Sequence, residues 1–172
     1  LFMGLIRSLL RIFTEAPASD AEGQPPSIAA TILDPTQAIA HINHYLETHH
    51  GREGIFATLF FGMLTPQTGR LEYINAGHES PLVVDTAGHL RALEPTAPAV
   101  GMLRRAEFRA AAVQLKPGDT LIAFTDGVTE AGTTPAAFFG TDGVRRTIAA
   151  AGREGGGFLG RLEQAVFEHL DG

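Results

Sequence analysis

The chain has 172 residues, of which 44% are apolar and 19% charged, so it can build the core of one domain and is not disordered by composition. Its formal net charge of −6 argues against nucleic-acid binding as the main function. Cysteine is absent, which excludes disulfides, cysteine nucleophiles and thiolate metal sites and fits a reducing compartment, so we expect a cytoplasmic protein.

The N-terminal segment, residues 1–14, places its apolar side chains three and four positions apart, which predicts an amphipathic helix. Arg7 and Arg11 interrupt it, and no apolar run in the sequence reaches the roughly 18 residues that span a bilayer, so no membrane segment is predicted. The chain opens inside this apolar pattern without a Met, which indicates a sequence cut at its N-terminus. Residues 15–33 hold three prolines and are predicted to form a loop.

A second helix is predicted to start at Asp34-Pro35, because an N-cap acid followed by proline at the first helical position is a typical helix start. Ile39, Ile42 and Leu46 mark its buried face, and it should end near Gly51.

The pattern then changes to strands. Residues 55–64 form a nearly continuous apolar run, which predicts a strand buried on both sides. Residues 65–69 are predicted to form a hairpin turn, and residues 70–76 alternate as a strand does. Further strands are predicted at 81–85, 89–93, 107–115 and 120–125, and helices at 143–151 and 158–170. Because runs of helices flank a run of strands, we predict an α+β fold with antiparallel strands.

Asp126 is the first candidate functional residue. It directly follows the apolar strand predicted to end at Thr125, and it precedes Gly127, where the chain can turn sharply. An acid at a strand end suits an oxygen ligand for a hard cation such as Mg²⁺ or Mn²⁺. The alternative is an ordinary Asp-Gly turn. Judged from Thr125-Asp126-Gly127 alone, this turn is the more common structure.

The segment Asn75-Ala76-Gly77-His78 is the second candidate. Its histidine could bind phosphate, act as an acid or base, or ligate a metal. The alternative is a loop closed by hydrogen bonds from Asn75 and His78 to the backbone, which these four residues favour. His41 and His44 have the spacing of helix-borne metal ligands, but no third ligand follows nearby, so we expect them to be solvated.

Several segments together resemble a family, the bacterial SpoIIE/RsbU-type serine/threonine phosphatases of the PPM (protein phosphatase 2C-like) group. Residues 1–10 resemble its A-x-L-F-M helix, and residues 56–62, FATLFFG, are similar to its F-x-T-L-F-Y-G strand. Residues 71–81, LEYINAGHESP, are similar to a strand with N-A-G-H-x-P, and residues 121–131, LIAFTDGVTEA, to L-x-x-Y-T-D-G-V-x-E-A. Each motif alone is weak, but their common order makes the resemblance strong.

The resemblance implies an α-β-β-α sandwich of two antiparallel sheets flanked by helices. It implies two Mn²⁺ or Mg²⁺ ions that activate a water for attack on a phosphoserine or phosphothreonine. By the same resemblance Asp126 is a metal ligand and therefore the catalytic residue. The implied substrate is a phosphorylated STAS-type anti-sigma-factor antagonist, and a sensor domain is expected elsewhere in the parent chain.

Two departures from the family pattern shape the remaining expectations. The family's first aspartates lie in G-G-D-x-x-D and D-x-x-G-x-G, and both motifs would precede Leu1. Its last aspartates lie in a D-D-x-T strand that would follow Gly172. Asp171 is not part of a D-D-x-T sequence, so we do not assign it to that strand. We therefore expect residues 1–172 to be a single PPM-type domain truncated at both ends and inactive by itself. Open sheet edges would favour a homodimer. The alternative is a non-catalytic regulatory or binding module that keeps the phosphatase scaffold.

Overall fold

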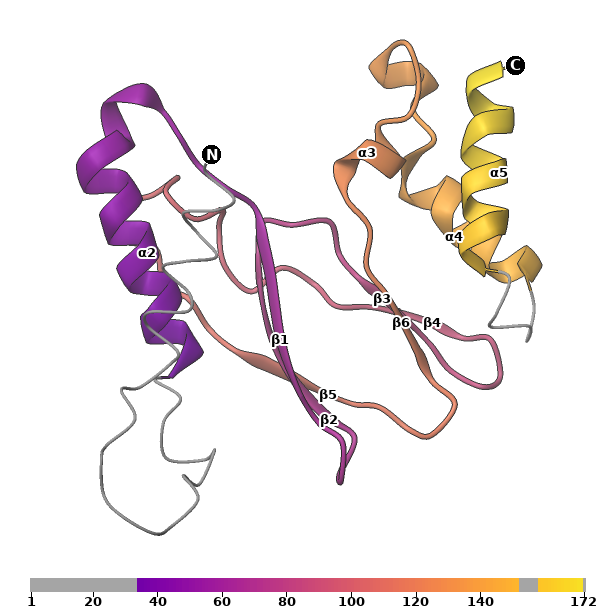
Figure 1. Ribbon diagram of the computed structural model, residues 1–172, viewed down its shortest axis with the longest axis horizontal. Coiled ribbons are helices and arrows are strands. Elements are labelled where there is room, and N and C mark those ends of the chain that lie inside the picture. Colours follow the sequence, from indigo (N-terminus) through magenta and orange to yellow (C-terminus); the bar gives the residue numbers. More distant parts are fainter. Residues whose placement is uncertain (1–33, 152–157, 172) are drawn as a thin grey trace, which may run out of the picture. The chain divides into compact units, whose positions relative to one another are not determined.

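The structure is a computed structural model that describes residues 34–151 and 158–171 (Figure 1). The helix predicted for residues 1–14 and the loop predicted for 15–33 lie outside the described residues. The described part divides into two compact units. The first contains residues up to Leu64, Leu71–His78 and Pro95–Val113, and the second contains Thr65–Arg70, Glu79–Glu94 and the residues from Gln114 onward. In the residues described, none of the helices has the length and apolar character needed to cross a membrane.

Helix α2, Pro35–His50, opens the first unit as the sequence predicts. The Asp34 carboxylate accepts a hydrogen bond from the Thr36 N–H at 3.0 Å, and Pro35 occupies the first turn, so the N-cap forms as expected. The apolar face of the helix packs into one core with side chains of strand β2 and of the segment that leads to β5. This core contains Ile39, Ile42, Leu46, Ile74, Ala76, Val100 and Phe108.

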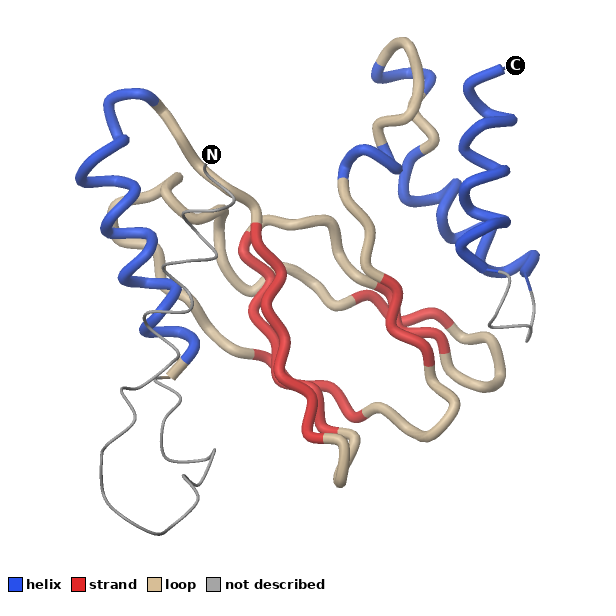
Figure 2. The backbone as a smooth tube through the Cα atoms, in the orientation of Figure 1, coloured by secondary structure: helices blue, strands red, loops and turns tan. Residues whose placement is uncertain are grey.

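The sheet of the first unit has the order β1-β2-β5, with β1 at Leu59–Thr65, β2 at Arg70–Ala76 and β5 at Ala111–Gln114 (Figure 2). The hairpin turn forms as predicted: the Thr65 carbonyl accepts from the N–H groups of Thr68 (3.1 Å) and Gly69 (2.8 Å). The prediction that the first strand is buried on both sides is wrong. Within the described sheet β1 is an edge strand, and its residues are half-buried or exposed.

The second unit contains the sheet β4-β3-β6, with β3 at Leu82–Val84, β4 at Leu90–Ala92 and β6 at Thr120–Ile122. Both neighbours run antiparallel to β3, and Leu82 lies opposite Ala92 and Ile122. All three strands are shorter than predicted. In the β3–β4 hairpin the side chain and N–H of His89 hydrogen-bond the Asp85 carboxylate at 2.9 Å each, which lowers the pKa of Asp85 to about 2.

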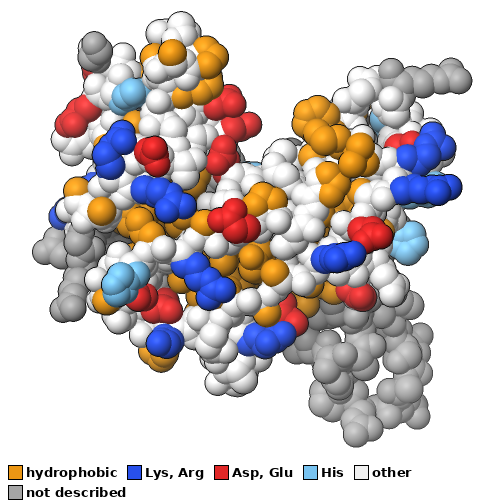
Figure 3. Space-filling view, turned by 180° about the vertical axis from the view of Figure 1, so that it is seen from behind, with side chains coloured by type: hydrophobic (Ala, Val, Ile, Leu, Met, Phe, Trp, Pro, Cys, Tyr) orange, Lys and Arg blue, Asp and Glu red, His pale blue; other side chains and the backbone are white. Residues whose placement is uncertain are grey.

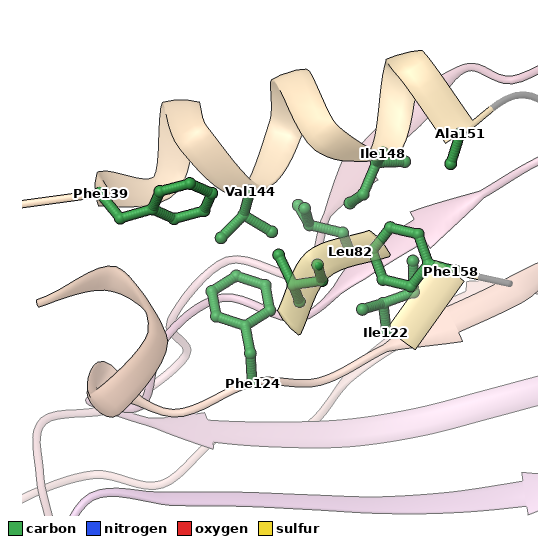
Figure 4. Packing of buried hydrophobic residues seen from close by; sticks show 9 residues of the cluster. Leu82, Ile122, Phe124, Phe139, Val144, Ile148, Ala151 and Phe158 are labelled. Atoms are coloured by element: carbon green, nitrogen blue, oxygen red, sulfur yellow. The ribbon is translucent and has the colours of Figure 1, made fainter. Parts of the chain in front are cut away.

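Helices cover this second sheet. They are the short α3 at Asp126–Thr129, α4 at Gly140–Ala151 and α5 at Phe158–Asp171, and a 3₁₀ turn at Pro135–Ala137 lies between α3 and α4. In the first unit, a 3₁₀ turn at Gly51–Glu53 follows α2. Side chains from β3, β6, α4 and α5 point toward one another in a single core (Figure 4). Its buried members are Leu82, Ile122, Phe124, Phe139, Val144, Ile148, Ala151, Phe158 and Leu162. The described elements confirm the α+β class, with two antiparallel sheets flanked by helices.

Charged side chains are mixed on the face of the molecule that Figure 3 shows. Acidic and basic groups both occur across it.

Candidate functional site

Asp126 stands where the β6 strand gives way to helix α3. The strand ends at Ile122, Phe124 remains anchored in the core, and Thr125 is extended before Asp126 takes the first helical position. Two backbone bonds hold the turn: the Val128 N–H donates to the Thr125 carbonyl (3.0 Å), and the Glu130 N–H donates to the Asp126 carbonyl (2.7 Å). The chain therefore presents this carboxylate at the start of α3, and residues 123–125 separate it from β6, whereas the sequence predicts a strand that runs directly up to Asp126.

The Asp126 side chain is exposed, and its carboxylate makes no hydrogen bond or ion pair with the described residues. Oxygen donors without a protein partner suit a hard divalent cation, so Asp126 fits Mn²⁺ or Mg²⁺ as one ligand. Such ions take about six oxygen ligands or more. Within residues 34–151 and 158–171, however, no three His, Asp or Glu side chains stand together in a way that could hold a metal. The described residues thus provide one fitting ligand and do not complete a metal centre.

Glu79 is a residue of this region that the sequence motifs do not single out. Its carboxylate accepts a hydrogen bond from the hydroxyl of Thr129 at 3.1 Å, and Thr129 is buried. Thr129 is the last residue of α3, so the bond connects Glu79 to the helix that Asp126 begins. The two partners are 50 positions apart, and Glu79 occupies the unspecified position of N-A-G-H-x-P, so no local pattern indicates their contact.

The Asn75–His78 segment consists of the last two residues of β2 and the bend that follows them, and Asn75 closes this bend. The Asn75 side chain is fully buried, and its Oδ1 accepts the N–H of His78 at 2.9 Å. The backbone of Asn75 accepts from the N–H groups of Thr96 (2.8 Å) and Ala97 (3.1 Å). The contribution of Asn75 agrees with the loop-closing alternative. The imidazole of His78 instead lies 3.4 Å from the hydroxyl of Thr58, so it does not bond the backbone as that alternative supposed.

Gly77 allows this loop to form, because its φ is +67° and a Cβ there would lie 2.9 Å from the Ala99 nitrogen. We expect Gly77→Ala to lower the free energy of unfolding by about 2–3 kcal/mol, since it adds both backbone strain and a steric clash. Gly54→Ala is the matched control: φ is +64° and no atom lies within 4 Å of the added Cβ, so only the strain of about 1–2 kcal/mol remains. Chemical denaturation of the two variants checks this, and equal destabilisation would contradict the proposed clash.

The remaining candidate histidines do not form a site among the described residues. His41 and His44 are exposed on α2. At the end of the helix, His49 stacks on Tyr45 with ring centroids 4.4 Å apart, and His50 lies 3.2 Å from the carboxylate of Glu53.

Comparison with solved structures identifies the class of fold. The chain is similar to the SiaA-PP2C domain of Pseudomonas aeruginosa, with a TM-score of 0.70, 16% identity and coverage of 99% of this chain and 62% of that one. It is also similar to the RsbU and RsbW domains of Rv1364c from Mycobacterium tuberculosis, with a TM-score of 0.68, 23% identity and coverage of 97% and 42%. At these identities the likeness shows the fold, which is that of PP2C-like phosphatase domains.

Sequence comparison identifies the family. The model of the Stage II sporulation protein E (SpoIIE) family matches residues 1–172, so the chain belongs to this family. Protein IcfG of Synechocystis is 35% identical over 187 residues, which cover all of this chain and 29% of that protein. The phosphoserine phosphatase RsbP of Bacillus subtilis is 36% identical over 59 residues, 34% of this chain and 15% of RsbP. The chain thus spans less than a third of the length of either relative.

Proposed function

We propose that this chain forms part of a metal-dependent protein serine/threonine phosphatase that acts in the cytoplasm. Such an enzyme hydrolyses the phosphate ester of a phosphoserine or phosphothreonine in a protein substrate. The support is membership of the SpoIIE family and a fold shared with PP2C-like phosphatase domains. The observation that carries the proposal is the exposed carboxylate of Asp126, which makes no hydrogen bond or ion pair with the described residues and stands at the start of α3, inside the motif that the family resemblance marks as metal-binding.

In this proposal Asp126 is one carboxylate ligand of Mn²⁺ or Mg²⁺ in the full-length protein, and further ligands come from outside the described residues. Bound ions of this kind supply an activated water and neutralise negative charge on the phosphoryl oxygens. The contribution of the described residues is positional. Phe124, buried in the core, anchors the segment between β6 and α3, and the backbone bonds of α3 fix the turn that presents the carboxylate.

The substrate that we propose is a phosphorylated STAS-type antagonist of an anti-sigma factor, which would place the protein in the control of sigma factors. The family resemblance supports this choice, and one relative is named a phosphoserine phosphatase. An attached sensor domain and a homodimer remain predictions.

The proposal is tested by incubating the full-length protein with a phosphoserine-labelled STAS-domain protein and following phosphate release. We expect release with Mn²⁺ or Mg²⁺, none after chelation with EDTA, and recovery when the metal is restored. We expect residues 1–172 alone to show no appreciable turnover. If the full-length protein binds the phosphoprotein but releases no phosphate with any divalent ion, the non-catalytic binding module replaces the phosphatase.

A further inference from the structure

The antiparallel ladder between β3 and β6 stops short of Asp126. Its register pairs Val84 with Thr120 and ends where Leu82 lies opposite Ile122. Because the strands are antiparallel, the residues that precede Leu82 and those that follow Ile122 leave the ladder at the same end. The first of these segments contains Glu79 and the second leads into Asp126, so the two motif segments separate from the sheet together.

A side-chain hydrogen bond joins the two segments again beyond the ladder. The hydroxyl of Thr129, with only 5% of the residue exposed, donates to Oε1 of Glu79 at 3.1 Å. The same hydroxyl lies 3.4 Å from the backbone carbonyl of Asp126. A hydrogen bond to a carboxylate is stronger than one between neutral groups. Because Thr129 is buried, water competes little for its hydroxyl. Glu79 therefore lies against the turn that presents Asp126.

Helix α3 needs such a contact to keep its conformation. It has four residues, a single turn, and its N-cap residue Thr125 makes no side-chain capping bond. A helix this short is unstable by itself, because the ordering of its first turn is not repaid by further hydrogen bonds. Contacts with the rest of the unit must therefore hold it, and the bond to Glu79 acts at its last residue.

We infer that Glu79 is a positioning residue for Asp126, acting through the hydroxyl of Thr129. The inference has two parts: the bond orders helix α3, and this order sets the affinity of Asp126 for its cation. The second part rests on the proposed function, whereas the first part does not. Glu79 itself contacts neither the cation nor the substrate in this account.

The test uses the full-length protein, four variants of the Glu79–Thr129 pair and one control variant. Thr129→Val removes the hydroxyl at nearly constant volume, and Glu79→Ala removes the acceptor. Thr129→Ser and Glu79→Gln are the conservative variants, since each keeps a group that can make the bond. Thr147→Val is the matched control, because the Thr147 hydroxyl bonds the Gly143 carbonyl (2.9 Å) within the longer helix α4.

Four measurements separate positioning from general stability. Hydrogen exchange of the Glu130 amide, which bonds the Asp126 carbonyl, reports on the order of α3. Calorimetric titration with Mn²⁺ alone reports the metal affinity, and turnover of p-nitrophenyl phosphate gives kcat and KM at saturating Mn²⁺. Thermal unfolding shows whether each variant is folded.

We expect Thr129→Val and Glu79→Ala to speed exchange of the Glu130 amide and to weaken Mn²⁺ binding about tenfold, with a smaller change in KM. Thr129→Ser and Glu79→Gln should recover most of the affinity, and Thr147→Val should match the wild type. Unchanged exchange in folded Thr129→Val and Glu79→Ala would overturn the first part of the inference. Faster exchange with wild-type Mn²⁺ affinity would overturn the second. A wild-type protein that neither binds Mn²⁺ nor turns over substrate would overturn the proposed function, while the exchange result would still decide the first part.

Discussion

Replacing Asp126 by asparagine in the full-length protein is expected to reduce Mn²⁺-dependent phosphatase activity about a thousandfold while leaving the fold intact. The amide keeps the shape of the side chain but removes the charge that holds a hard cation. Loss of metal assistance costs several kcal/mol in the transition state, which corresponds to a factor of this size. Since the Asp126 carboxylate makes no hydrogen bond or ion pair with the described residues, its replacement should not change the melting temperature appreciably.

The matched control is Asp171→Asn, which removes an exposed carboxylate in the last turn of α5. Asp171 lacks the context of the family's C-terminal aspartates, so this variant should retain wild-type turnover and Mn²⁺ affinity. The measurement is the initial rate of phosphate release over a series of Mn²⁺ concentrations. Full activity in the Asp126→Asn protein would remove Asp126 from the metal site.

Replacing Leu82 by alanine is expected to give the largest loss of stability in the second unit, about 2–5 kcal/mol. Leu82 is fully buried and belongs to the core that includes side chains from β6, α4 and α5 (Figure 4). Truncation removes apolar contacts and leaves a cavity that the surrounding strands and helices cannot close. Hydrogen exchange of the slowest amides in β3 and α4 measures the change in the free energy of unfolding of this unit.

Leu159→Ala provides the comparison, because Leu159 is 77% exposed on α5. Its replacement should change the stability by less than about 0.5 kcal/mol. Similar effects of the two substitutions would show that the core described for the second unit is wrong.

Local patterns predicted most of the secondary structure. The N-cap and proline at Asp34-Pro35 placed the start of α2, and strict alternation placed β2 with the bounds that the structure has. Patterns with weaker periodicity were less accurate. The strand predicted for 55–64 begins only at Leu59, and the one predicted for 120–125 ends at Ile122. Strand ends depend on whether a neighbouring strand continues alongside, and the sequence of one strand does not contain this information.

Burial also differed from the sequence prediction. The apolar run that includes Phe60 and Phe61 predicted a strand covered on both sides, but β1 is an edge strand and its side chains remain partly exposed. Conversely, polar Asn43 is buried in α2, where it accepts the Gly101 N–H at 2.7 Å and donates to the Leu103 carbonyl at 3.0 Å. Its partners are about 60 positions away in the chain, so only the folded structure explains why this amide is buried.

The sequence by itself determined the class of fold, the family resemblance and the position of Asp126 after an apolar segment, because periodicity and motif order are local properties of the chain. Only the tertiary structure decided what surrounds that residue. It brings Glu79 to Thr129 across 50 positions, closes the Asn75–His78 loop through a buried amide, and leaves the Asp126 carboxylate without a bonding partner among the described residues. The bond between Glu79 and Thr129 arises where distant segments pack together, so it follows from the geometry of the fold and not from the spacing of residues.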